Sequence, residues 1–150
     1  MAAMNTNASN PSGADTLEGD RFREILRQWA ATVGVVAVRD DGEVYGTTIT
    51  SFTPVNAEPP LVLISLGANA QALPFLHEGT PFVINLLAED QGRVAAVYAD
   101  SFPVGPSPFA ETGPPVMDGA LASLHCRVHH LVPVAGANRL VLAWVEDGDV

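Results

Sequence analysis

The spacing of apolar residues changes along the chain, and the first clear pattern is helical. Four apolar side chains recur with the period of one helix face: Phe22, Ile25, Leu26 and Trp29. The arginines and the glutamate between them would occupy the opposite, solvent-facing side. We therefore predict an amphipathic helix that starts near Phe22, ends near Ala31 and packs its apolar face against the rest of the protein.

Short β-branched and apolar runs follow, and they predict a chain that is mostly β-strand. Strands are predicted at residues 33–39, from 44 into a threonine-rich segment, at 61–66, 82–87, 121–132 and 140–145. Asp40-Asp41-Gly42 is a turn signal between the first two strands. Asp147-Gly148 is a second such signal with no strand after it, so we expect an unpaired sheet edge there and a domain that lacks its last strand.

The segments between the strands predict two short helices and one long loop. The helices are expected at residues 69–78, with Asn69 as N-cap, and at residues 90–100. Residues 101–115 are rich in proline and glycine and are predicted to be irregular. Long loops in small domains are often functional, so Phe102 and Phe109 either cover a ligand or anchor the loop.

Together these elements indicate a mainly β fold with small helices, a β-barrel with helical additions. The chain has 150 residues, which suits one domain. Residues 1–15 are small, polar and turn-rich, and they predict a flexible tail ahead of a domain at residues 16–150.

Composition and charge narrow the setting and the partners. A single cysteine, Cys126, rules out a disulfide within the chain and favours a reducing compartment. The sequence has no long apolar run and no signal-peptide pattern, so a cytoplasmic protein is expected. The net charge is −10 and every cation is an arginine, which disfavours nucleic acids and anionic membranes as partners. Four arginines outside the first helix are candidates for holding a phosphate or are simple surface cations: Arg39, Arg93, Arg127 and Arg139.

Two familiar chemistries have little support. His125 and His129 share a strand face but would lie about 13 Å apart, too far for one zinc ion. We therefore interpret the histidines around Cys126 as a polar strand face and expect no metal site. The sequence contains no nucleophile elbow, no phosphate loop and no Gly-x-Gly-x-x-Gly motif, so hydrolase and Rossmann interpretations are also disfavoured.

The segment from Tyr45 to Gly67 is the best candidate for a binding site. It reads YGTTITSFTPVNAEPPLVLISLG, in which small hydroxyl-bearing residues precede a proline pair and an apolar strand. Small residues expose backbone N–H groups beside a hydrophobic wall. A flat heteroaromatic ligand needs this combination.

This segment resembles the signature of the flavin reductase family, through Gly46 to Thr53 followed by Pro59-Pro60-Leu61. Residues 22–38, 82–91 and 115–128 resemble the same family, so the similarity extends over nearly the whole chain from about Arg21. The resemblance implies an FMN-binding split β-barrel, Greek-key-like, and a homodimer with its site near the subunit contact. It also implies that the usual family chain continues with one more strand.

The activity implied by the resemblance is an NAD(P)H-dependent flavin reductase. FMN, or FAD, would accept hydride from NADH or NADPH, and the reduced flavin would serve a partner monooxygenase. No catalytic side chain is expected. The implied flavin-binding residues are Thr47, Thr48, Ile49, Thr50, Ser51, Phe52, Ser65, Leu66, Gly67, Asn69, Gln71, Ala72 and Asn85. Asn138 would lie on the nicotinamide side.

The sequence departs from the family pattern at two places. Ala70 and Ala72 stand where the family usually has serine and threonine hydroxyls for the phosphate. Gly136-Ala137-Asn138 stands where a Gly-Asp-His turn is common. The alternatives are therefore a flavin-binding electron carrier, or a split-barrel protein that binds no flavin and acts as a structural or interaction subunit.

Overall fold

The computed structural model describes residue 13, residues 15–100 and residues 102–150, and most of the predicted tail lies outside these residues. Seven strands form one antiparallel sheet in the order β2-β1-β5-β6-β7-β4-β3. The strands are β1 (Gly34–Asp40), β2 (Glu43–Ile49), β3 (Phe52–Ala57), β4 (Pro60–Leu66), β5 (Pro81–Leu86), β6 (Ala122–Pro133) and β7 (Arg139–Asp149). The helices are α1 (Gly19–Leu26) and α2 (Gly92–Ala99), with short 3₁₀ turns η1 (Leu73–Phe75) and η2 (Glu89–Gln91). This confirms the prediction of a mainly β fold with small helices.

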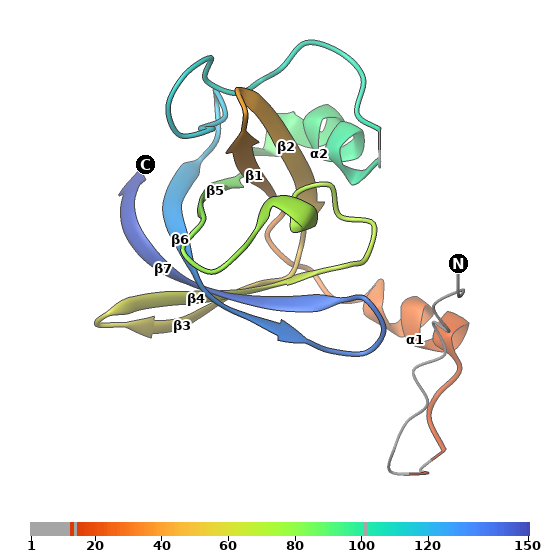
Figure 1. The fold of residues 1–150 in the computed structure, drawn as a ribbon. Helices are drawn as coiled ribbons and strands as arrows, with labels where there is room; N and C mark the ends of the chain where they lie inside the picture. Colours follow the sequence, from red (N-terminus) through yellow and green to blue (C-terminus); the bar gives the residue numbers. More distant parts are fainter. Residues whose placement is uncertain (1–12, 14, 101) are drawn as a thin grey trace, which may run out of the picture.

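The strands curve so that most of them face a common core (Figure 1). The main core cluster gathers apolar side chains from six strands and from the segment after β4, with Ile64, Leu66, Phe82, Ile84 and Val141 almost fully buried. A second cluster lies on the other face of β1, where α2 and the long loop cover Val35 and Ala37. Because β1 is covered on both faces, Val35 to Val38 are all buried, which explains their continuous apolar run.

The predicted turn at Asp40-Asp41-Gly42 is confirmed. Asp41 and Gly42 both have positive φ, 48° and 81°, as the tight turns that join twisted strands require. The strands at residues 33–39, 82–87 and 121–132 and the helix at residues 90–100 were also predicted within a residue or two of their observed bounds. Within β6, Cys126 and Val128 are buried and Arg127 is exposed, as its alternation predicted.

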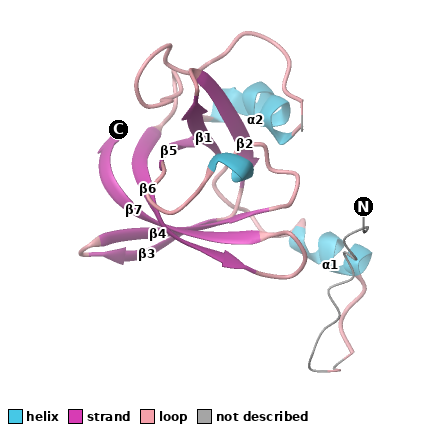
Figure 2. Cartoon of the chain, in the orientation of Figure 1, coloured by secondary structure: helices cyan, strands magenta, loops and turns pink. Residues whose placement is uncertain are grey.

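The first helix differs from its prediction. It ends at Leu26 rather than near Ala31, and it extends away from the sheet (Figure 2). Its expected packing is not found, since none of its residues is buried. The apolar face remains open, with exposed fractions of 53% for Phe22, 49% for Ile25 and 68% for Trp29.

The predicted hairpin turn at Asp147-Gly148 is wrong, because β7 continues through it to Asp149. His125 pairs with Asp147 and Cys126 pairs with Val145, so Glu146 forms a bulge. A Cβ at Gly148 would lie 3.1 Å from the Ser123 carbonyl oxygen. The glycine therefore permits close approach of β6 and does not mark a turn. The expected unpaired edge is found at this end of β7, because β4 pairs with β7 only from Arg139 to Trp144 and, among the described residues, 145–149 pair with β6 alone.

Candidate functional site

A pocket of about 420 Å³ lies where four separate segments of the chain meet. These segments are β2, the residues after β4, the end of α2 and the turn before β7. The pocket is lined by Thr47, Gly67, Ala68, Asn69, Ala70, Gln71, Tyr98, Ala99, Asp100 and Asn138. Five residues predicted to bind flavin or nicotinamide are thus brought together: Thr47, Gly67, Asn69, Gln71 and Asn138.

Two of these side chains also fix the segment after β4. Thr47 Oγ1 accepts a hydrogen bond from the Ala72 N–H at 3.2 Å. Asn138 Oδ1 accepts one from the Ala68 N–H at 3.2 Å. A Cβ at Gly67 would come within 3.7 Å of the same Asn138 oxygen, so the loop passes close to Asn138. The pocket wall is therefore set by contacts between segments that are distant in sequence.

The helix predicted at residues 69–78 is wrong. Only the 3₁₀ turn η1, Leu73–Phe75, is present. The N–H groups of Ala70, Leu73, Phe75 and Leu76 donate to carbonyls three residues earlier, which is the 3₁₀ pattern. Pro74 cannot donate to the Ala70 carbonyl as an α-helix would require, and its ring would crowd that position. Asn69 therefore caps no helix.

Several hydroxyl groups predicted to meet the flavin bind the protein itself. Thr48 Oγ1 donates to the Ala95 carbonyl at 2.7 Å and joins β2 to α2. Ser51 Oγ donates to the Ser65 carbonyl at 2.7 Å, and the Ser65 N–H donates back to Ser51 Oγ at 3.1 Å. These side chains shape the segment between β2 and β3. The backbone N–H groups of Thr50 and Ser51 lie between the two strands, outside either ladder.

The remaining predicted residues lie in or beside the core. Ile49, Leu66 and Ala72 are buried in the main cluster. Phe52 packs against that cluster and lines a shallow apolar groove beside β3 and β4. The side chains of Ile49, Leu66 and Ala72 are therefore not available to a ligand.

Asn85 has an internal role. Its side chain is fully buried. Its Oδ1 accepts hydrogen bonds from the Met117 N–H and the Ser123 hydroxyl, both at 2.8 Å. Its Nδ2 donates to the carbonyls of Pro115, at 3.2 Å, and Val35, at 3.4 Å. The amide thus attaches the long loop to β1, β5 and β6, and Asn85 does not line the pocket.

Tyr98, Ala99 and Asp100 line the pocket but were not predicted from the sequence. Tyr98 is held close to β2, where a Cβ at Gly46 would lie 2.7 Å from the tyrosine ring. Gly46 therefore serves to seat Tyr98, which also contacts Phe109 edge-to-face with ring centroids 5.3 Å apart. Partial burial raises the pKa of the Tyr98 phenol. Gly46, at the start of the threonine-rich segment, was the one sign in the sequence of a close contact. The sequence does not show that its partner is Tyr98.

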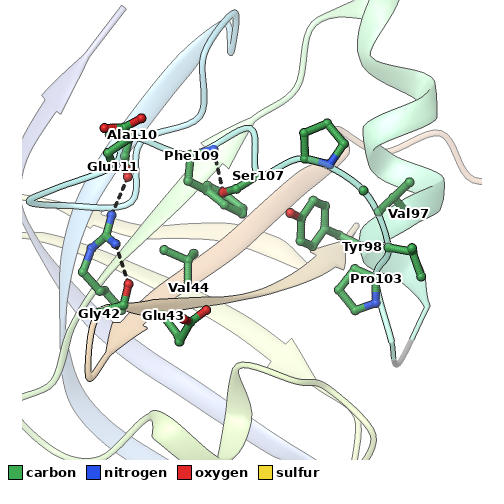
Figure 3. A pocket seen from close by; sticks show the side chains of 14 residues that line it. Gly42, Glu43, Val44, Val97, Tyr98, Pro103, Ser107, Phe109, Ala110 and Glu111 are labelled. Atoms are coloured by element: carbon green, nitrogen blue, oxygen red, sulfur yellow. Dashed lines mark hydrogen bonds between the residues drawn. The ribbon is translucent and has the colours of Figure 1, made fainter.

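A larger cavity of about 600 Å³ lies on the other side of Tyr98. Figure 3 shows Tyr98, Val97 and Pro103 on one side of it and Phe109 and Ser107 on the other. Phe109 is buried in the second core cluster and anchors the loop, whereas Phe102 is 81% exposed. Of the predicted ligand-binding residues only Arg39, a candidate for holding a phosphate, lines this cavity, so we place the candidate site in the smaller pocket.

None of the four candidate arginines lines the smaller pocket. Arg39 donates to the carbonyls of Gly42, Ala110 and Gly113, two of which belong to the long loop. Arg127 pairs with Glu146, which raises the pKa of the guanidinium and lowers the pKa of the carboxyl. Arg139 donates to the Asn138 carbonyl at 2.9 Å.

Three of the histidines lie on β6, where His129 and His130 are exposed and His125 is half-buried. His130 Nδ1 lies 3.0 Å from Glu78 Oε1, and His125 Nε2 lies 3.4 Å from Asp149 Oδ2. Within residues 13, 15–100 and 102–150, no three metal-ligating side chains come together. Cys126 is buried, and this burial, with a smaller contribution from Glu146, raises the pKa of its thiol to about 12. In the same ranges, no helix is both long and apolar enough to cross a bilayer.

The pocket combines small residues with hydrogen-bonding side chains. Its wall at residues 67–71 consists of small residues and two side-chain amides, with Tyr98 opposite. Such a wall exposes backbone groups to a flat polar ligand. Thr50 and Ser51 follow directly after β2, the strand that holds Thr47.

The model of the flavin reductase like domain family matches residues 26–150, most of the chain. The chain belongs to the flavin reductase family. It is 38% identical over 128 residues to the reductase component of 4-hydroxyphenylacetate 3-monooxygenase from Thermus thermophilus, covering 85% of this chain and 83% of that protein.

Solved structures of flavin reductases have a similar fold. The flavin reductase PheA2 in its native state superposes with a TM-score of 0.79 and is 29% identical, with 89% of this chain and 88% of that chain covered. The NADH:FAD oxidoreductase SgcE6 of Streptomyces globisporus, in complex with NAD and FAD fragments, superposes with a TM-score of 0.72. It is 31% identical, with 91% and 86% covered.

Proposed function

We propose that this protein is an NAD(P)H-dependent flavin reductase that supplies reduced flavin to a partner monooxygenase. The observation that carries the proposal is the 420 Å³ pocket, in which Thr47, the 67–71 segment and Asn138 meet in a member of the flavin reductase family. The relative from Thermus thermophilus is named as the reductase component of a monooxygenase, which supports a monooxygenase as the partner. FMN or FAD is the flavin that the resemblance to the family implies.

A bound flavin would supply the redox chemistry, since its ring can accept from NADH or NADPH a hydride, which carries two electrons. The protein's task is to bind and orient. We assign the ring to the backbone amides of residues 47–52 and the ribityl chain to Gly67, Asn69 and Gln71. Asn138 would lie on the nicotinamide side, where its Nδ2 is a neutral hydrogen-bond donor. No proton transfer from a side chain is required for hydride transfer, so no catalytic acid or base is assigned.

The resemblance also implies a particular barrel fold and a homodimer, and we include both in the proposal. We infer that the curved seven-stranded sheet is the family's FMN-binding split β-barrel, with Greek-key-like connections. A homodimer is also proposed, because a second copy would cover the exposed apolar face of α1.

A flavin titration followed by NADH tests the proposal. The purified protein is titrated with FMN, FAD and riboflavin while flavin fluorescence is followed, and NADH or NADPH is then added under nitrogen. Catalytic bleaching of the oxidised-flavin absorbance is expected. Binding without bleaching would instead indicate an electron carrier, and no binding at micromolar flavin would exclude both activities.

Replacing Asn69 and Gln71 by alanine localises the site. The double variant is expected to weaken flavin binding about tenfold or more, because it removes two side-chain amides from the pocket wall. Replacing Gln28 and Asn56, which lie outside the pocket, is the matched control. Equal affinity of the two double variants would place the flavin elsewhere.

A further inference from the structure

The charge of the pocket opposes the phosphate of FMN. Asp100 is the one charged side chain among the described residues that line it. The carboxylate is held in place, because its Oδ1 accepts the Phe102 N–H at 3.0 Å. Asp100 also follows directly after α2, whose C-terminal end carries a partial negative charge. Both features disfavour an anion in this part of the pocket.

No cation in the described chain offsets this charge at the pocket wall. All seven cationic side chains are arginines of the described residues, and none lines the pocket. Arg139 is the nearest in sequence; it does not line the pocket, but its Nη1 donates at 2.9 Å to the carbonyl of Asn138, which does. Arg39 and Arg127 are bonded to loop carbonyls and to Glu146.

The segment after β4 offers little else to a phosphate. It begins no α-helix, so the partial positive charge of a helix N-terminus is missing. Ala70 and Ala72 carry no hydroxyl, and the N–H groups of Ala68, Ala70 and Ala72 donate within the protein. The remaining polar side chains of this segment are those of Asn69 and Gln71. Their neutral amides suit the hydroxyls of a ribityl chain.

We propose that Asp100 is a specificity residue that makes this site favour an uncharged flavin, riboflavin, over its phosphorylated forms. The inference rests on the proposed flavin reductase function and names its substrate class. The ring and the ribityl chain would supply the binding free energy, and the phosphate would weaken it through repulsion by Asp100. The flavin would then bind and leave as a substrate that is easily exchanged.

Comparing riboflavin with FMN on the unmodified protein is the first test. The dissociation constant of riboflavin is expected to be equal to or lower than that of FMN. Added salt screens charge repulsion. The dissociation constant of FMN should therefore fall as salt rises, while that of riboflavin stays unchanged. FMN bound tenfold tighter than riboflavin, or weakened by salt, would overturn the inference but support the reductase. Failure to bind either flavin would overturn both.

Asp100→Asn is the second test, since asparagine keeps the oxygen that accepts the Phe102 N–H. The variant should bind FMN about threefold or more tightly, as expected for removal of a nearby like charge, with riboflavin affinity unchanged. Asp90→Asn is the matched control, because it makes the same change in net charge at the exposed η2 turn. An equal gain in both variants would assign the effect to net charge and overturn the role of Asp100. An unchanged FMN affinity in Asp100→Asn would overturn it as well.

Discussion

At the scale of single residues, Asn85 illustrates how a polar side chain stabilises the long loop. Replacing it by alanine would leave the Met117 N–H and the Ser123 hydroxyl without their acceptor in the core. Unsatisfied buried groups and the resulting cavity predict a loss of about 2–4 kcal/mol in the free energy of unfolding. Urea unfolding measures this loss. Asn56→Ala on the exposed β3 is the control, expected within about 0.5 kcal/mol of the parent protein. If Asn85→Ala lowered the free energy of unfolding as little as the control does, this role of Asn85 would be contradicted.

Cys126 predicts a pH dependence of stability. Its thiol has an ordinary pKa of 9.0, and burial raises the pKa to about 12 in the folded protein. A raised pKa means that the folded state favours the neutral thiol. Its contribution is complete below about pH 9 and is lost as the pH rises toward about 12, by at most about 1.4 kcal/mol per pH unit.

Comparison with Cys126→Ala isolates this contribution from other titrating groups. The free energy of unfolding of both proteins is measured between about pH 8 and about pH 10.5. The parent protein should lose stability faster than the variant above about pH 9. Parallel curves would show that the thiol titrates normally in the fold.

At the scale of elements, short-range patterns predicted the strands, and long-range contacts explain the misses. The turn at Asp41-Gly42 and the alternation in β6 depend on neighbours in sequence, and both were predicted. Residues 69–78 were predicted as a helix that starts at Asn69, but Pro74 lies inside that span, where it removes a helical hydrogen bond, and only η1 forms. Gly148 was taken as a turn residue, yet its glycine is needed for contact with Ser123, far away in sequence.

In the candidate site, too, local patterns predicted some residues, whereas long-range contacts brought in the others. The threonine-rich segment and the residues after β4 were identified from local pattern and resemblance, and the two meet where the Ala72 N–H donates to Thr47 Oγ1. Tyr98 lies in α2 and Asp100 directly after it, and no local feature of that helix shows that its end closes the pocket. Asn85 was predicted to bind the flavin, but it binds the long loop instead. Its hydrogen bonds to residues 115–117 depend on a loop conformation that the sequence does not reveal.

The exposed apolar face of α1 allows a test of the proposed homodimer. Phe22→Ser with Ile25→Ser should raise the dissociation constant of the proposed homodimer tenfold or more, since burying each side chain is worth about 1.5–3 kcal/mol. Analytical ultracentrifugation over a concentration series measures this. Arg21→Ser with Glu24→Ser, an exposed ion pair on the same helix, is the control. An unchanged dimer in the first variant would exclude the apolar face of α1 from the contact.

At the scale of the whole molecule, the net charge of −10 acts on every ligand that the proposed reaction uses. NADH and NADPH carry phosphates, and thirteen of the chain's seventeen acidic residues lie outside residues 15–29. A field of one sign repels ligands of the same sign and slows their encounter. This effect is distinct from that of Asp100, because it acts over the whole surface and does not depend on the flavin.

We therefore predict that kcat/KM for NADH rises with ionic strength. The screening length falls from about 30 Å at about 10 mM salt to about 8 Å at about 150 mM, so distant charges no longer reach the nicotinamide nucleotide. An increase of about two- to fivefold is expected over this range, with riboflavin as the acceptor so that the flavin carries no charge. Asp90→Asn and Asp100→Asn should show similar salt slopes, since each changes the net charge by one. A decrease with salt would mean that local cations attract the nucleotide, and Arg139 beside Asn138 would be the first to replace.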